Sequence, residues 1–315
     1  ALFSGNPGGS MGYRNGFRLV ATGPRSRKAR FAEAPISDAN KLAPLITSWL
    51  TEARSLPFFA YIHFREPHGP YKPPRQFLRR FVQDGMTYQE RVAAHYDGNL
   101  AFVDSQVGLI FRHLRKLNLW DRTIIIVMAD HGEAFWQHGE RGHIRQVYDE
   151  MIRIPMIFRF PNEGAFRGIR KSALVGTVDI MPTLIDLFSF TRKNVYFLNG
   201  QSLLQAFGSA QPQRLLLSVC AGNKPAYSLR SKEFKYIEYE DSKFPQELYH
   251  LETDPRETAN VTNQFPVMAG FYRAELHRKL TDLRQLAAGI KGWKRPTLTL
   301  DEQTREELRA LGYVY

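Results

Sequence analysis

The segment TIIIVMA, residues 123–129, has the composition of a strand buried in the middle of a sheet. Its residues are almost all apolar and mostly β-branched, as in strands that are covered on both faces. Titratable residues then follow within fourteen positions: Asp130, His131, Glu133, His138 and His143. Ligands bind at the carboxyl ends of parallel strands in open α/β sheets, so we interpret 123–129 as a scaffold strand that presents polar groups to a site.

A long helix precedes this strand. Between residues 90 and 117, six apolar side chains step by three or four positions, the spacing of a helix with one face on a sheet. Two further buried-strand candidates are PFFAYIHF at 57–64 and RIPMIFRFP at 153–161. The order strand, helix, strand implies a right-handed crossover with parallel pairing. We therefore predict one mostly parallel sheet, covered by the helix on one face, that contains 57–64, 123–129 and 154–159.

After about residue 210 the texture of the sequence changes. Short strand-like runs separated by turns, RLLLSVC, AYSLRS and FKYIEYE, predict a four-stranded antiparallel sheet. A helix is expected over roughly 266–287. The expected fold class is therefore α/β: a core over 1–210 with a mostly parallel sheet flanked by helices, then a smaller antiparallel α+β subdomain over 211–315.

The chain of 315 residues is strongly basic, with a formal net charge of +12 and a sequence pI near 9.8. A basic surface suits nucleic acid, an anionic membrane or a small anionic substrate. Because the Lys and Arg residues are scattered and no nucleic-acid motif is present, we expect no nucleic-acid partner. No apolar run approaches the roughly 18 to 20 residues that span a bilayer, so no transmembrane segment is predicted. The single Cys220 excludes an intrachain disulfide and a Cys-based zinc site.

Asp130 and His131 are candidate metal ligands. Neighbouring side chains of a strand point to opposite faces, so both reach one ion only if the strand has ended and the chain is turning, which Gly132 permits. A carboxylate beside an imidazole suits Mn²⁺, Zn²⁺ or Fe as well as Ca²⁺ or Mg²⁺. The alternative is that Asp130 caps a following helix and His131 is merely packed. The residues alone leave both interpretations open.

Several other histidines are less specific. His68 stands between two prolines in a rigid loop after strand 57–64, and loops at strand ends often carry function. His138 and His143 are either polar residues of a Gly-rich excursion or part of a loop that swings back over the site. Glu133 is interpreted as a residue that favours a helix N-terminus, with no part in a site.

The same segments carry a resemblance to a known family. In order along the chain, they are PFFAYIHFREPHGPYKPP, YDGNLAFVDSQVGLIFRHLRKLNLWDRTIIIVMADHGE, QHGERGHIRQVYDEMIRIPMI, VDIMPTLIDLF, NGQSLL, ELYHLETDPRETANV and RALGYV. With them the sequence resembles a sulfatase of the alkaline phosphatase superfamily over nearly its whole length. The resemblance implies an alkaline-phosphatase-like fold and hydrolysis of a small anionic sulfate ester at a divalent metal ion.

The resemblance also implies roles for individual residues. Asp130 and His131 match two metal ligands of the family, for which Ca²⁺ is the expected ion and Mg²⁺ or Mn²⁺ are alternatives. His68 matches the histidine near the scissile ester, which helps to protonate the leaving oxygen. His143 stands where members carry Lys or His against a sulfate oxygen. Sulfuryl transfer, like phosphoryl transfer, needs charge on its oxygens to be stabilised, and a metal with two imidazoles fits that demand.

One departure from the family pattern concerns the nucleophile. Sulfatases also carry an N-terminal pair of Asp ligands and a Cys-x-Pro-Ser-Arg segment whose Cys or Ser becomes formylglycine. Neither feature is present in these 315 residues. Cys220 lies in SVCAGN, far downstream and in the wrong context. We therefore expect either a fragment of a longer sulfatase or a divergent member without the nucleophile.

Two other functions remain open from the sequence. A phosphodiesterase or phosphonate monoester hydrolase of the same superfamily shares the Asp-His pair and differs mainly in its substrate pocket. A non-catalytic, anion-binding chain is the interpretation that the absent nucleophile favours. Oligomeric state is not indicated, and members of the family are commonly secreted or periplasmic.

Overall fold

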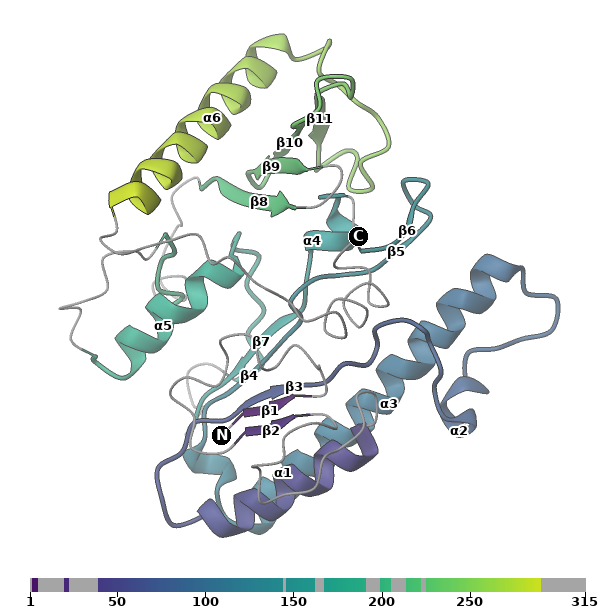
Figure 1. The fold of residues 1–315 in the computed structure, drawn as a ribbon, viewed down its shortest axis with the longest axis vertical. Helices are drawn as coiled ribbons and strands as arrows, with labels where there is room; N and C mark the ends of the chain where they lie inside the picture. Colours follow the sequence, from purple (N-terminus) through teal and green to yellow (C-terminus); the bar gives the residue numbers. More distant parts are fainter. Residues whose placement is uncertain are drawn as a thin grey trace. The chain divides into compact units, whose positions relative to one another are not determined.

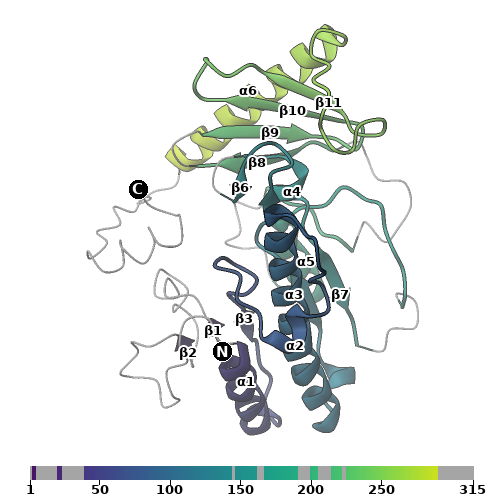
Figure 2. The same ribbon diagram turned by 90° about the vertical axis from the view of Figure 1, so that its right-hand side faces the viewer.

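The computed structural model describes residues 2–4, 20–22, 39–143, 146–161, 167–190, 199–204, 214–221 and 225–289 of the 315-residue chain. Contacts within the chain divide it into two compact units. The first unit comprises 1–126, 158–164 and 299–315, and the second comprises 127–157 and 165–298. Figures 1 and 2 show the elements of both units from two directions.

The first unit packs two long helices against a small parallel sheet. The sheet has the strand order β2-β1-β3, with β1 at Leu2–Ser4, β2 at Val20–Thr22 and β3 at Tyr61–His63. Both neighbouring pairs are parallel. The helices are α1, Ala39–Ala53, and α3, Tyr88–Lys116, with the short helices α2, Arg75–Leu78, and η2, Trp120–Arg122.

The core of this unit forms between α1 and α3, which lie side by side in Figure 1. Ile46 of α1 and Leu114 of α3 belong to one buried cluster, and Ile62 of β3 packs against it. The predicted helix over 90–117 is confirmed, and a capping box between Thr87 and Glu90 starts it two residues earlier. No helix among the described residues combines the length and apolar character that a bilayer-spanning helix needs.

Strands β4, Ile125–Met128, and β7, Met156–Arg159, pair with each other as a separate two-stranded sheet. The prediction that 57–64, 123–129 and 154–159 share one sheet is therefore wrong for the described residues, because β3 pairs with β1. Its partner β1 comes from the start of the chain, which is rich in Gly and Pro, a composition typical of loops. Apolar composition indicates a strand, but not which backbone lies beside it or how deeply it is covered, because the residues of β4 are half-buried or exposed.

The second unit contains the predicted antiparallel sheet, and it is confirmed. Its strand order is β11-β10-β9-β8, and each neighbouring pair is antiparallel. The strands are β8, Leu216–Cys220, β9, Ala226–Arg230, β10, Phe234–Tyr239, and β11, Glu247–His250.

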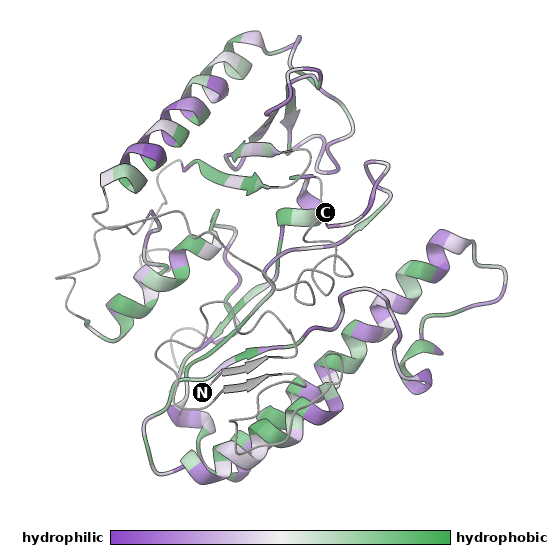
Figure 3. Ribbon diagram, in the orientation of Figure 1, coloured by the Kyte–Doolittle hydropathy of each residue, from purple (hydrophilic) through white to green (hydrophobic). Residues whose placement is uncertain are grey.

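Helix α6, Pro266–Gly289, lies along one face of this sheet and confirms the helix expected over 266–287. Tyr272 and Leu276 of the helix share a buried cluster with Leu229, Tyr236 and Leu248 of the strands. Figure 3 shows hydrophobic and hydrophilic residues alternating along α6, as expected for a helix with one face on a sheet.

Several short elements lie between β4 and β8 along the chain. They are the hairpin of β5, Ala134–Phe135, and β6, Arg141–Gly142, the helices α4, Asp149–Ile152, and α5, Ile180–Leu187, and the turn η3, Thr177–Asp179. The predicted division between two domains near residue 210 falls at 205–213, outside the described residues, so it stays a prediction.

Candidate active site at the end of β4

The turn that follows β4 rests directly on the backbone of α4. The Gly132 amide donates to the carbonyl oxygen of Met151 at 2.7 Å. A Cβ atom on Gly132 would lie 2.0 Å from the carbonyl oxygen of Glu150, which is too close for any side chain. The strand has ended by this point, as the metal interpretation requires. Gly132 is thus needed for a close backbone approach, which fixes residues 130–133 against α4.

Asp130 and His131 offer two donor atoms on the same side of this turn. The side chain of Asp130 is 65% exposed and that of His131 is 31% exposed. His131 Nδ1 lies 2.7 Å from the carbonyl oxygen of Gly132. Because a carbonyl only accepts hydrogen bonds, Nδ1 carries a proton, and Nε2 is the ring nitrogen left for a ligand. That Nε2 lies 3.9 Å from Asp130 Oδ1.

His143 joins this pair. Its ring stacks on the ring of His131, with a centroid distance of 4.5 Å and an angle of 23° between the planes. Its Nδ1 lies 3.1 Å from Glu133 Oε1, and both side chains are buried, at 8% and 5% exposure. The structure thus brings Asp130, His131 and His143 together, as the sequence predicted for these three.

The β5–β6 hairpin explains how residues ten positions apart meet. Ala134 pairs with Gly142 across the hairpin, so Glu133 and His143 flank this pair on its open side. The interpretation of Glu133 as a helix N-terminal residue is wrong, because a strand begins after it. Sequence reasoning also missed Glu133 as the partner of His143. The Gly-rich loop between two short runs was the signal for a hairpin that would have placed the two residues opposite each other.

The donor pair fits part of a metal shell. Two ligands of one ion, each bonded at about 2.0–2.6 Å, lie roughly 3 to 5 Å apart, so the separation of 3.9 Å is suitable. A hydrogen bond from the second ring nitrogen to a carbonyl is the usual way to fix a ligating histidine. The described residues include no group of three or more His, Cys, Asp or Glu side chains arranged to hold an ion. As ligands, Asp130 and His131 alone would therefore supply only part of a coordination sphere.

His68 lies in the loop after β3, in the first unit. Its Nδ1 lies 2.6 Å from the carbonyl oxygen of Gly69, the same local arrangement as in His131. Asp130, His131 and His143 belong to the second unit. The convergence of His68 with them on one cavity therefore stays a prediction.

The loop that carries His68 is attached to both long helices of its unit. Glu66 Oε1 accepts a hydrogen bond from the amide of Ala39, the first residue of α1, at 3.2 Å. His95 of α3 holds the carbonyl oxygen of Tyr71 at 3.1 Å through Nδ1. These two contacts flank His68 in sequence and fix the position of the loop on the helices.

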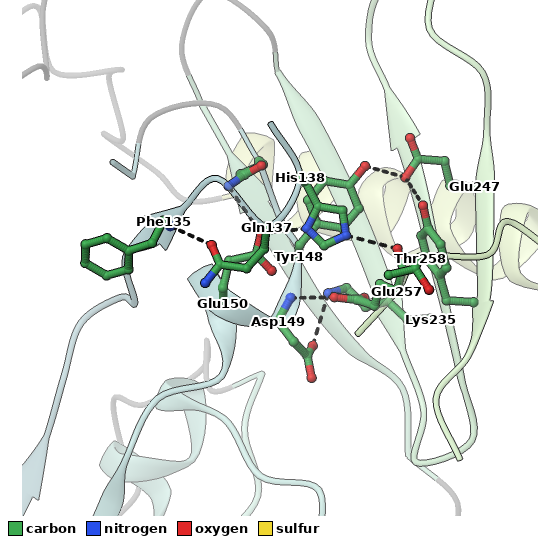
Figure 4. A network of polar contacts seen from close by, with 12 residues as sticks. Phe135, Gln137, His138, Tyr148, Asp149, Glu150, Lys235, Glu247, Glu257 and Thr258 are labelled. Atoms are coloured by element: carbon green, nitrogen blue, oxygen red, sulfur yellow. Dashed lines mark hydrogen bonds and ion pairs between the residues drawn. The ribbon is translucent and has the colours of Figure 1, made fainter. Parts of the chain in front are cut away.

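His138 does not face the pair at the end of β4. Its ring stacks on Tyr148, with centroids 3.6 Å apart and planes at 6°, and both ring nitrogens are bonded (Figure 4). Nδ1 lies 2.7 Å from Glu150 Oε1, and Nε2 lies 2.9 Å from the carbonyl oxygen of Glu257. Burial lowers the pKa of His138, but the acceptors Glu150 and Glu257 outweigh it and raise the pKa above its ordinary value.

A buried ion cluster lies next to His138. Lys235 of β10 is fully buried, and its Nζ lies 2.7 Å from Glu257 Oε1 and 3.1 Å from Asp149 Oδ1. Arg230 also pairs with Asp149. Burial raises the pKa of Asp149, but the two cations outweigh it and hold the pKa below its ordinary value. For Glu257, burial prevails over Lys235 and raises the pKa.

Comparison with known proteins gives the family. A family model of sulfatases matches residues 11–190, and a model described as N-sulphoglucosamine sulphohydrolase, C-terminal, matches residues 139–286. The chain belongs to the sulfatase family. Members of this family generally depend on a divalent metal ion.

Two relatives illustrate the match in sequence. Arylsulfatase K of Rattus norvegicus is 32% identical over 190 residues, which cover 56% of this chain and 33% of the relative. The ulvan-active sulfatase of Formosa agariphila is 24% identical over 251 residues, which cover 72% of this chain and 48% of the relative. The chain thus spans between a third and a half of the length of these curated relatives.

The fold is similar to that of solved hydrolases. A phosphonate monoester hydrolase of Agrobacterium radiobacter superposes with a TM-score of 0.64 at 23% identity, covering 81% of this chain and 62% of that one. The predicted fold class, an alkaline-phosphatase-like α/β core with a smaller antiparallel C-terminal part, is confirmed.

Proposed function

We propose that this protein takes part in sulfate-ester hydrolysis at a divalent metal ion, with Asp130 and His131 as two of the ligands. The observation that carries the proposal is the pair of donors 3.9 Å apart at the end of β4, in a chain of the sulfatase family. When bound, the ion supplies positive charge that polarises the ester. Calcium is the ion we expect, because the family resemblance points to it and a carboxylate oxygen suits it.

His143 is proposed to contact a sulfate oxygen. Its ring lies on that of His131, so a substrate group held beside His131 comes within its reach. The contact between its Nδ1 and Glu133 keeps Nε2 as the atom directed away from the carboxylate.

His68 is proposed to donate a proton to the leaving alcohol oxygen. Its Nδ1 is bonded to the carbonyl oxygen of Gly69, so Nε2 is the nitrogen that exchanges a proton with substrate. The nucleophile of the family, formylglycine, has no counterpart segment in these 315 residues. We therefore expect this chain alone to hydrolyse aryl sulfates weakly or not at all, and a longer chain with formylglycine to be active, with His68→Ala slowing turnover there.

Calorimetric titration with Ca²⁺, Mn²⁺ and Mg²⁺ tests the metal assignment without need of turnover. Asp130→Asn should weaken binding strongly, because it removes the only carboxylate of the pair. Asp282→Asn is the matched control, since Asp282 of α6 is a similarly exposed carboxylate, at 58%, that pairs with surface Arg278. Equal affinities of the two variants would assign the ion to other residues.

A second candidate is phosphodiester or phosphonate monoester hydrolysis, favoured by the similarity of fold to the Agrobacterium radiobacter enzyme. A third is anion binding without catalysis. An assay of the chain with p-nitrophenyl sulfate, bis-p-nitrophenyl phosphate and a phenylphosphonate monoester shows whether sulfate-ester or phosphoryl-ester hydrolysis is the faster reaction. Turnover of any of them that Asp130→Ala abolishes would reveal a nucleophile within this chain. Turnover that survives Asp130→Ala would exclude the site proposed here.

A further inference from the structure

We propose that His138 is a positioning residue, which ties the tip of the β5–β6 hairpin to α4 and to the C-terminal sheet and thereby holds His143 against His131. The meaning of this role for catalysis rests on the proposed function. The positioning itself concerns only contacts inside the second unit.

The hairpin is too short to fix itself. It has only two residue pairs, Ala134 with Gly142 and Phe135 with Arg141. An isolated two-stranded hairpin is marginal in water even when it is longer, so its orientation must come from outside contacts. The base of this hairpin carries Glu133 and His143, which means that any tilt of the hairpin moves the candidate site.

Helix α4 touches both ends of the hairpin. At the base, the carbonyl oxygen of Met151 accepts from the amide of Gly132 at 2.7 Å. At the tip, the carboxylate of Glu150 bonds Nδ1 of His138 at 2.7 Å. The hairpin is thus held at two points on one short helix, and His138 supplies the point farther from the site.

The third point is Glu257, which follows β11 and is tied to the C-terminal sheet through Lys235. His138 Nε2 donates to the carbonyl oxygen of Glu257 at 2.9 Å, and the Glu257 carboxylate accepts from the amide of Asp149 in α4 at 2.6 Å. Lys235 of β10 pairs with the same carboxylate (Figure 4). Glu257 therefore joins the hairpin tip and α4 to one strand of the sheet.

The His138 ring is suited to this role because both nitrogens face acceptors. A carbonyl oxygen and a carboxylate oxygen both accept hydrogen bonds. A ring that donates to both carries a proton on each nitrogen, which makes it an imidazolium. The raised pKa of His138 agrees with this state. The groups that face the His138 ring are the Glu150 carboxylate, the Glu257 carbonyl and the Tyr148 ring. Lys235 Nζ lies 6.0 Å from the centroid of the Tyr148 ring.

The test compares His138→Gln with a matched control, His250→Gln. His250 of β11 is also a partly buried histidine beside a carboxylate, 3.5 Å from Glu233, but it packs on Phe234 and Phe265 instead of the hairpin. Imidazole resonances of His131 and His143 are recorded by NMR on histidine-labelled protein, where ring stacking shifts them. We expect both signals to move in His138→Gln and to stay in place in His250→Gln.

Metal affinity gives the second measurement. Loss of a group bonded directly to a metal ligand lowers affinity by about 10- to 100-fold. His138 acts at one remove, through Glu150 of the helix on which Gly132 rests, so His138→Gln should weaken Ca²⁺ or Mn²⁺ binding by less than about tenfold. Glu150→Gln keeps the size of its side chain and serves if His138→Gln fails to fold, with the same direction of change. Unmoved His131 and His143 signals in a folded variant would overturn the proposal. A wild-type chain that binds no metal would count against the proposed function only, because the NMR comparison does not depend on the ion.

Discussion

Two regions of the second unit hold acidic side chains next to basic ones, and the two regions differ in how far these side chains are exposed to water. Around Lys235 the charges are out of water: the exposed fraction is 0% for Lys235, 1% for Glu257 and 12% for Asp149. At the end of β4 the fractions are 65% for Asp130 and 31% for His131. Buried charges must be paired to be tolerated, whereas exposed donors keep positions open for a ligand. Burial, more than residue type, therefore separates the structural cluster from the candidate site.

The largest effect should come from Lys235→Met. This change leaves Asp149 and Glu257 buried with less compensating charge, and breaking a buried pair in this way costs about 3–5 kcal/mol. Denaturant unfolding measures the loss, with Lys232→Met, an exposed lysine three residues away, as the control. Equal stability of the two variants would mean that the buried cluster contributes nothing to the fold.

Gly132→Ala should have the next largest effect, and it acts on the link between the two regions. The new Cβ would meet the carbonyl oxygen of Glu150 at 2.0 Å, so α4 and the turn must separate. We expect a loss of about 1–3 kcal/mol and weaker metal binding. Gly270→Ala in α6 is the control, because nothing lies within 4 Å of its Cβ position, and it should stabilise the helix by about 0.5–1 kcal/mol.

The pH dependence of stability tests the His138 contact. The pKa of His138 is raised in the folded protein above the ordinary value of 6.5. Its contribution is therefore complete below pH 6.5 and is lost as the pH rises through the folded pKa. Thermal unfolding followed between about pH 6 and 9 should show the difference between wild type and His138→Gln shrinking with rising pH. A difference that grows with pH would contradict the imidazolium assignment.

The smallest effect on stability should come from Asp130→Asn. Exposed substitutions usually change stability by no more than about 0.5 kcal/mol, so the unfolding midpoint should stay that of the wild type while metal affinity falls. This outcome would sharpen the contrast with Lys235→Met. A loss of stability comparable to that of Lys235→Met would place Asp130 among the structural charges instead.

The sequence was sufficient where a local pattern decides the structure. Helix α3 follows from apolar residues every three or four positions, and the C-terminal sheet follows from short runs between turns. Asp130 and His131 were named as candidate ligands because they directly follow a recognisable strand. In each case the information lies within a few residues of the feature.

The buried cluster was not found because its members are distant in sequence and unremarkable alone. Lys235 stands 86 residues after Asp149 and lies in a strand where alternation would allow it to face water. The strand partner of β3 was missed for a related reason, since β1 comes from a segment without strand composition. Pairings of this kind are set by tertiary packing, and no periodicity of one segment reports them.

The His138 contact also orders events during synthesis. The acceptor of His138 Nε2 belongs to Glu257, 119 residues further along the chain. At about 5–20 residues per second, a ribosome needs about 6–24 s to make that stretch. Strand β4 and the hairpin are therefore complete well before the residue that holds the hairpin tip exists. With His138 as the positioning residue, the candidate site reaches its final geometry only after all four strands of the C-terminal sheet, which end at His250, have been made.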